Sequence, residues 1–191
     1  TISDYPRYFY VHSGAPAASQ VLEYIGEQIE FTNSLNINLR KSLKIRLQYD
    51  KFNWNLEKMF ADSGQKYFLE DSKQNFISRL NDCSLSVSTT NSTTFLETLG
   101  LNFPTIVFFN PNCNEIREDA KLLVDSLIKV RILHKTPRSA AIFLNKLDGN
   151  IENWWFGEEL QRVRKIFCDS YALGGSKWSH QWHQLFESLK K

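Results

Sequence analysis

Short runs in which apolar and polar residues alternate are separated by stretches whose apolar residues recur at intervals of three and four. Alternation is typical of strands, and the longer intervals are typical of helices. The pattern predicts strands at residues 8–11, 43–47, 67–69, 83–88, 106–109 and 131–133. It predicts helices at residues 16–35, 53–61, 75–80, 114–130, 137–147 and 154–189, the last of them broken at 174–175.

Strands and helices alternate from residue 8 to residue 147, and the connections between them are short. This order predicts an α/β fold with a Rossmann-like, mostly parallel sheet that carries helices on both faces. We therefore expect one domain at residues 1–150, which binds its ligand at the carboxyl ends of its strands. Residues 151–191 are predicted to form a helical C-terminal tail that packs on this domain.

The connection between the fourth and fifth predicted strands is the most informative one. Its polar residues Asn91, Ser92, Thr93 and Thr94 lead directly into a short helix. The first backbone N–H groups of a helix have no partner inside the helix, and the helix dipole adds positive charge there. We therefore predict that a phosphate or diphosphate binds at this helix start, with the side-chain hydroxyls as further donors.

Glu97, on the same short helix, has two interpretations. Thr94 and Glu97 have the spacing of a capping box, in which the glutamate only closes the helix start. Alternatively, its carboxylate accepts hydrogen bonds from ribose hydroxyls, as acidic residues do in many nucleotide sites. Gly100 is predicted to end the helix in a left-handed conformation, and Pro104 is predicted to open the next strand, which is apolar on both faces.

Two further places are predicted to border the same crevice. Arg46 ends a predicted strand, where its planar guanidinium is suited to a diphosphate, and a surface ion pair with Asp50 is the alternative. The run Asn110-Pro111-Asn112 follows the predicted strand at residues 106–109. Loops at this edge of a sheet often carry function.

Composition narrows the classes of partner. The 191 residues carry a formal net charge of +2, which argues against nucleic acid as the main partner. No apolar run approaches the roughly 20 residues that span a bilayer. The three cysteines are widely spaced, which is typical of reduced thiols in a cytoplasmic protein. The chain begins at Thr1 without a methionine, and we expect it to be a piece of a longer protein.

Histidine and tryptophan residues do not predict a second site. His180 and His183 are interpreted as surface or packing residues, so no metal site is predicted. The pair Trp154–Trp155 is interpreted as a core anchor for the helical tail. The sequence has no Gly-rich phosphate loop and no kinase signature, and it identifies no catalytic residue.

The run from Ser92 to Glu97, followed by Gly100 and then by Pro104, resembles the donor-binding half of GT-B glycosyltransferases. It is also similar to the related UDP-N-acetylglucosamine 2-epimerases. In those families a helix-borne glutamate precedes the proline of the next strand by the same seven positions. The resemblance implies that Glu97 contacts the ribose and that the helix start holds the diphosphate.

A set of segments covering nearly the whole chain resembles a family of bacterial transferases associated with surface-carbohydrate biosynthesis. These segments lie at residues 20–35, 45–47, 91–99, 103–106, 136–141 and 154–155. The resemblance implies a nucleotide-activated sugar as donor substrate and no cofactor. It also implies an N-terminal acceptor domain that this chain lacks, and a full-length enzyme that could associate with a membrane surface.

The chain departs from the related families at two places. Thr89 stands where many retaining GT-B enzymes have a second glutamate, and the run from Arg46 to Tyr49 lacks the histidine found in related polyol-phosphate transferases. Two alternatives therefore stay open. One is a nucleotide-sugar 2-epimerase-like enzyme, and the other is a non-catalytic binding or scaffold domain that recruits a partner through its aromatic tail.

Overall fold

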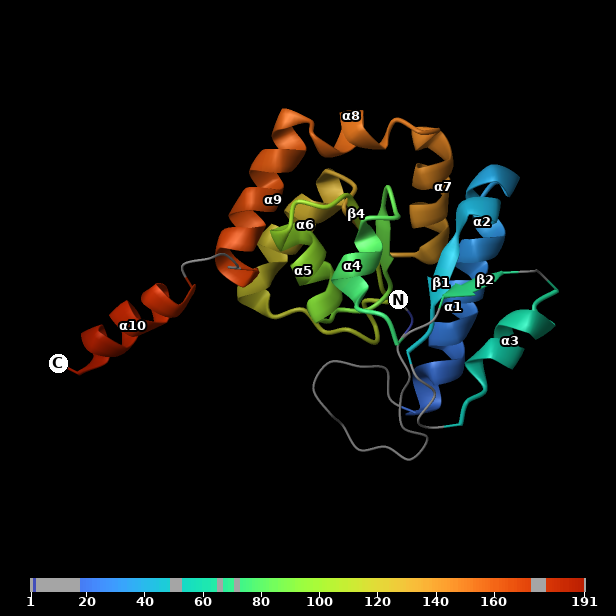
Figure 1. The fold of residues 1–191 in the computed structure, drawn as a ribbon, viewed down its shortest axis with the longest axis horizontal. Coiled ribbons are helices and arrows are strands. Elements are labelled where there is room, and N and C mark those ends of the chain that lie inside the picture. Colours follow the sequence, from blue (N-terminus) through green and yellow to red (C-terminus); the bar gives the residue numbers. More distant parts are fainter. Residues whose placement is uncertain are drawn as a thin grey trace.

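The computed structural model describes residues 2, 18–48, 53–64, 67–70, 73–172 and 178–190, in which short strands alternate with helices (Figure 1). Its first elements are η1 (Ala18–Gln20), α1 (Val21–Ser34), α2 (Ile37–Ser42), β1 (Lys44–Arg46), α3 (Leu56–Asp62), β2 (Phe68–Glu70), α4 (Phe76–Leu80) and β3 (Ser86–Ser88). They are followed by α5 (Thr93–Gly100), β4 (Thr105–Phe108), η2 (Glu118–Ala120), α6 (Lys121–Lys129), β5 (Leu133–His134), α7 (Pro137–Leu147), α8 (Ile151–Trp155), α9 (Glu158–Tyr171) and α10 (Trp178–Leu189).

The described strands form two short sheets, and all of their pairings are parallel. Strands β1 and β2 form one sheet, and β3, β4 and β5 form the other, with β4 in its centre. Each connection between paired strands contains at least one helix, as parallel pairing requires. The predicted α/β, Rossmann-like fold with parallel strands is confirmed.

Strand β4 is buried on both faces, because its successive side chains point to opposite sides of the sheet. Ile106 and Phe108 pack with residues of α1 and α7 on one side. Val107 and the following Phe109 pack with residues of α5, α6 and α9 on the other side. The prediction that helices cover both faces is therefore confirmed for this sheet.

The helices after residue 150 begin within this core. Trp155 is fully buried, and its indole Nε1 donates hydrogen bonds to the backbone oxygen and to Oδ1 of Asn102, both at 3.0 Å. Trp154 donates from its Nε1 to the backbone oxygen of Val130 at 3.1 Å. The interpretation of the two tryptophans as a core anchor is therefore confirmed, whereas the division into units at residue 150 stays a prediction.

Helix α10 differs from the other helices in its surroundings. Figure 1 shows it projecting from the rest of the chain. Every described side chain from Ser179 to Lys190 is exposed, including those of Trp182 and Phe186, whose rings stack at 5.5 Å. The predicted helical tail is confirmed in the described residues, where α8, α9 and α10 form it and Gly157 separates α8 from α9. The prediction that the tail packs on the rest of the chain does not hold for α10, whose described side chains are exposed.

Some local predictions are wrong at their boundaries. Gly100 is the last residue of α5, and the left-handed residue is Asn102, with φ 56°. The helix predicted at 114–130 begins only with η2, because Asn114 donates its side-chain N–H to the backbone oxygen of Asn110 at 3.0 Å and holds a turn. The strand predicted at 8–11 lies outside the described residues.

Helix α9 packs against the C-terminal end of α5. The Arg164 guanidinium of α9 donates to the backbone oxygen of Leu99 in the last turn of α5 at 2.8 Å. It also donates to the side-chain oxygen of Gln161 at 3.2 Å. This contact holds the middle of α9 against the end of α5.

Candidate functional site

The start of α5 lies directly after the carboxyl end of β3, as the sequence predicts. Ser92 is its N-cap residue, with extended backbone, but the Ser92 side chain does not cap the helix. Its hydroxyl instead lies 2.8 Å from the hydroxyl of Thr90. Asn91 and Thr93 are exposed beside it. The first backbone N–H groups of α5 are therefore not satisfied by a side-chain cap.

The capping box predicted for Thr94 and Glu97 is wrong. Thr94 is the second residue inside α5, because the helix already begins at Thr93. A residue within the helix cannot serve as its N-cap. Glu97 is therefore an exposed residue one turn into the helix, and its carboxylate makes no hydrogen bond or ion pair with the described residues.

Helix α1 covers the carboxyl ends of β3 and β4. Tyr24 of α1 lies with its hydroxyl 3.0 Å from the hydroxyl of Thr89, the residue that follows β3. Asn110, which follows Phe109 after β4, donates from its side chain to the Glu23 carboxylate at 2.9 Å. Thr89 and Asn110 line one small cleft together with Glu23 and Glu27. The sequence correctly places residue 110 beside the loop after β3.

Two carboxylates give this cleft an acidic wall. Burial raises the pKa of Glu27, and the neighbouring Glu23 raises it further, while a hydrogen bond from Asn110 lowers it. Burial also raises the pKa of the Cys113 thiol, and the charges of Glu23 and Glu27 add to that effect. The acidic side chains of this cleft therefore disfavour a phosphate.

Arg46 lies at the end of β1, as predicted, but its guanidinium is already engaged. It forms an ion pair with Glu70 at 3.6 Å and donates to the backbone oxygen of Gln74. The predicted alternative partner, Asp50, lies outside the described residues. Glu70 is the partner because parallel pairing places it directly opposite Arg46 in register.

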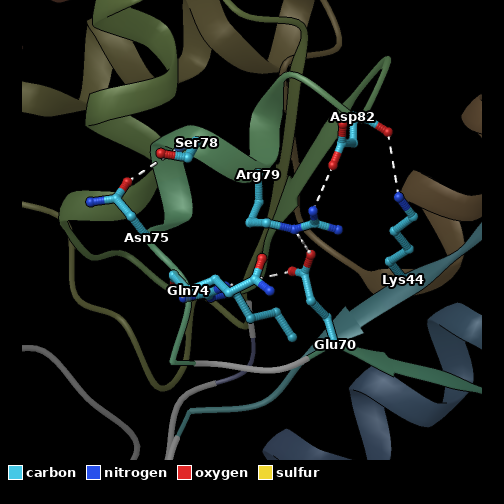
Figure 2. A network of polar contacts seen from close by, with 8 residues as sticks. Lys44, Glu70, Gln74, Asn75, Ser78, Arg79 and Asp82 are labelled. Carbon is cyan, nitrogen blue, oxygen red and sulfur yellow. Dashed lines mark hydrogen bonds and ion pairs between the residues drawn. The ribbon is translucent and has the colours of Figure 1, made fainter.

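Glu70 also binds a second arginine. Arg79 of α4 donates from Nε to Glu70 at 2.6 Å and from Nη1 to Asp82 at 2.6 Å. Figure 2 shows Arg79 reaching toward both carboxylates, with Lys44 of β1 beside Asp82. The network joins β1, β2 and α4, and its two arginines share one carboxylate between them.

A cavity of about 440 Å³ lies beside this network. Arg46 and Thr89 both line it, so the structure brings the end of β1 and the loop after β3 to one place. Asn91, Glu97 and the hydroxyl residues 92–94 are not among the residues that line it. The predicted site residues thus divide into an exposed helix start and an internal arginine.

A second cavity, of about 370 Å³, lies at the carboxyl ends of β4 and β5. Its wall includes Pro111 and Asn114 from the loop after β4, and it carries the charged residues Glu115, Lys121, Asp125 and Lys135. Charges of both signs suit a ligand that combines anionic and hydroxyl groups.

His134, at the end of β5, is a structural residue. Its Nε2 lies 3.1 Å from the backbone oxygen of Arg131, and its Nδ1 lies 3.0 Å from the hydroxyl of Ser139. Because a carbonyl only accepts, Nε2–H donates to it and Nδ1 accepts from Ser139. Burial lowers the pKa of His134 to about 4, so the ring is neutral at physiological pH.

The described residues contain neither a cluster of metal ligands nor a helix that could span a membrane. No group of three or more His, Cys, Asp and Glu side chains in these ranges is arranged to hold a metal ion. None of the described helices is both long enough and apolar enough to cross a membrane.

Comparison with known families decides the broad class of the protein. Residues 1–186 match the family described as LIC12162 family transferase. The chain belongs to this family. As a member of the LIC12162 family it is assigned a transferase function, and the match covers both the sheet and the helices that follow residue 150. No curated protein and no solved structure matches the chain.

Sequence reasoning missed several residues at the site of this LIC12162 family member. Glu23, Tyr24 and Glu27 of α1 reach the carboxyl ends of β3 and β4, and Cys113 lies beside them. The spacing of Glu23 and Glu27, four residues apart on one helix, is a signal that the sequence contains. The sequence does not show which strands this face of α1 covers.

Proposed function

We propose that this chain is the donor-binding domain of a nucleotide-sugar-dependent glycosyltransferase of the GT-B type. In this proposal it acts in the cytoplasm in the synthesis of bacterial surface polysaccharide. A nucleotide-activated sugar is the donor substrate, and no other cofactor takes part. The family assignment supports the transferase class, and the arrangement at the start of α5 supports the donor site.

The absence of a side-chain cap on α5 is the observation that carries the proposal. Ser92 turns its hydroxyl toward Thr90 rather than toward the helix, which leaves the first backbone N–H groups of α5 available to a ligand. Such groups, together with the positive end of the helix dipole, bind phosphate oxygens. The hydroxyls of Thr93 and Thr94 add donors at the same place.

Glu97 supplies the second element of the proposed site. Glu97 does not close a capping box, and its side chain is exposed. Its carboxylate lies one turn along α5 from the proposed phosphate position. A carboxylate in this position is suited to accept hydrogen bonds from the two ribose hydroxyls. Arg46 adds positive charge from the cavity side, provided that its guanidinium shares its donors with Glu70.

The proposed chemistry is stabilisation of a leaving group. As the bond between sugar and diphosphate breaks, negative charge grows on the diphosphate, and fixed donors at the helix start stabilise that charge. In this proposal the acceptor and the catalytic base come from an N-terminal domain outside this sequence. The isolated chain is then expected to bind a nucleotide weakly and to show little turnover, and the whole enzyme is expected to work at a membrane surface.

Calorimetric titration with a panel of nucleoside diphosphates tests the proposal. At least one of them should bind, and Glu97→Gln should weaken that binding by about 1–3 kcal/mol, because the hydrogen bonds to ribose are lost. The matched control is Glu159→Gln, which changes an exposed glutamate in the first turn of α9 and should leave the affinity unchanged. Equal affinities for all three proteins, or no binding by any nucleotide, would refute the donor site.

One observation favours a second candidate, a nucleotide-sugar 2-epimerase-like enzyme. Epimerisation needs acid and base groups beside the sugar, and the structure brings Glu23 and Glu27 to Thr89 at the carboxyl end of β3. Their shared cleft raises the pKa of Glu27, which is a property of catalytic acids. Incubation with UDP-N-acetylglucosamine, followed by analysis for the manno epimer, distinguishes this reaction from glycosyl transfer.

A further inference from the structure

Helix α10 has one apolar face that the described residues do not cover. Its four members recur at the spacing that places side chains on a single side of a helix, and they are Trp182, Leu185, Phe186 and Leu189. Their side chains are between 47% and 71% exposed. Figure 1 shows the helix projecting from the rest of the chain. An apolar stripe of this size in water indicates a surface that meets a partner.

The specific contacts of α10 stay within this helix and the residue that follows it. Lys190 donates to the Glu187 carboxylate at 2.6 Å, and Ser188 donates to the backbone oxygen of Leu185 at 2.7 Å. The rings of Trp182 and Phe186 stack on each other. Within the described ranges, no hydrogen bond, ion pair or ring contact joins α10 to another element. The apolar face is therefore not needed to hold the described fold together.

The other side of α10 is polar and the segment is net positive. His180, His183, Glu187 and Lys190 recur at helical spacing on this side. Residues 177–191 contain three lysines and one glutamate, so with neutral histidines their charge complements an anionic surface. Tryptophan, phenylalanine and leucine opposite a basic polar face are typical of helices that lie in the headgroup region of a membrane. An indole ring suits this region, because its body is apolar and its N–H is polar.

The length of α10 separates the possible partners. It has 12 residues, so it is about 18 Å long. A bilayer core is roughly 30 Å thick, so this helix would lie along a membrane rather than cross it. One side of the helix offers on the order of 200 Å², whereas a stable protein interface buries about 800 Å² on each partner. A dimer held by α10 alone would therefore be weak, whereas a lipid surface accepts an apolar helix face of this size.

We propose that α10 is a membrane-surface helix that binds an anionic lipid leaflet. Its apolar face enters the boundary between headgroups and acyl chains, and its lysines lie near the lipid phosphates. The choice of a membrane as the biological surface rests on the proposed function, in which the enzyme works at a membrane. The binding itself depends on α10 and needs no nucleotide, so it is measured separately from the donor site.

Co-sedimentation of the chain with lipid vesicles tests the proposal. The chain should bind vesicles of equimolar phosphatidylglycerol and phosphatidylcholine, and it should bind vesicles of phosphatidylcholine alone about tenfold more weakly. The double variant Trp182→Ser, Phe186→Ser should bind the anionic vesicles more weakly by about tenfold or more, because two large apolar side chains no longer enter the lipid. The matched control is His183→Ser, Gln184→Ser, which changes two exposed residues of the same helix outside the apolar face. It should bind like the unsubstituted chain.

Four results would overturn the proposal. The first is no sedimentation with anionic vesicles, which would leave calorimetric nucleotide binding, and with it the donor site, unaffected. The second is equal binding by the two double variants. The third is a lower Tm for Trp182→Ser, Phe186→Ser, which would show that the apolar face packs against the protein. The fourth is a dimer in size-exclusion chromatography that this variant abolishes, which would assign the face to a second copy of the chain.

Discussion

The indole Nε1 of Trp155 lies 3.0 Å from both the backbone oxygen and the side-chain Oδ1 of Asn102. Asn102 has a left-handed backbone and ends the turn after α5, and its Oδ1 also accepts from Gln161 at 3.0 Å. One turn residue therefore holds α8 and α9 against α5. An asparagine suits this position, because it tolerates the left-handed conformation and supplies an acceptor.

Substitution of Asn102 should separate these two contributions. Asn102→Gly keeps the left-handed backbone but removes the acceptor, and we expect a loss of about 1–2 kcal/mol in the free energy of unfolding. Asn102→Ala removes the acceptor and also strains the backbone, so it should cost about 1 kcal/mol more. Urea denaturation of both variants measures the difference. If both variants lose the same free energy of unfolding, the left-handed conformation of residue 102 contributes nothing to stability.

The stability of the protein should fall in mild acid because of His134. The pKa of His134 is lowered by burial from 6.5 to about 4. The folded state therefore favours the neutral ring, so its contribution is complete above pH 6.5 and is lost as the pH falls from 6.5 toward 4. The full loss is on the order of 3 kcal/mol. When denaturation is measured between pH 7 and 4, the variant His134→Gln should not show this loss of stability. The control His183→Gln, at an exposed site, should still show it.

Removal of the carboxylate of Glu70 should destabilise the network in Figure 2. Arg46 and Arg79 both bind this group, so Glu70→Gln leaves two guanidinium groups near each other without their shared counter-charge. We expect a fall in Tm of about 5 °C or more. Asp82→Asn is the matched control, because Asp82 is about half exposed and binds only one arginine. A fall of the same size in both variants would contradict the central position of Glu70.

The reactivity of Cys113 should report on the acidic cleft. Burial raises the pKa of this thiol, and the charges of Glu23 and Glu27 raise it further. Glu23→Gln removes one of these charges, so the pKa should fall and more thiolate should be present at pH 8. Alkylation of Cys113 by iodoacetamide, followed by mass spectrometry, should be about twofold to threefold faster. Glu30→Gln, on the same helix, should leave the rate unchanged.

Local chemistry in the sequence was sufficient to predict the sheet and the helix start of the candidate site. The apolar run at residues 106–109 required a strand buried on both faces, and β4 is that strand. The polar residues before α5 could be recognised because unpaired N–H groups at a helix start are a property of the segment itself. Their role in binding a nucleotide stays a prediction.

Contacts between segments that are distant in the sequence could not be predicted. Arg46 pairs with Glu70, 24 positions away, because of the register between two parallel strands, which no spacing in the sequence specifies. Asn110 meets Glu23 across 87 positions because α1 packs over the carboxyl end of β4, which no spacing in the sequence specifies either. Gly100 and Asn102 are both able to adopt a left-handed conformation, and the contact with Trp155 decides in favour of Asn102. In each case a partner from a distant segment determines the result.

Arg164 illustrates a charge whose counter-charge is not an acidic side chain. It donates to the backbone oxygen of Leu99, at the end of α5, from the middle of α9. The C-terminal end of α5 carries about half a negative charge. The guanidinium therefore serves as a counter-ion for the peptide backbone. A lysine at this position would keep the charge but lose the fork that reaches both Leu99 and Gln161.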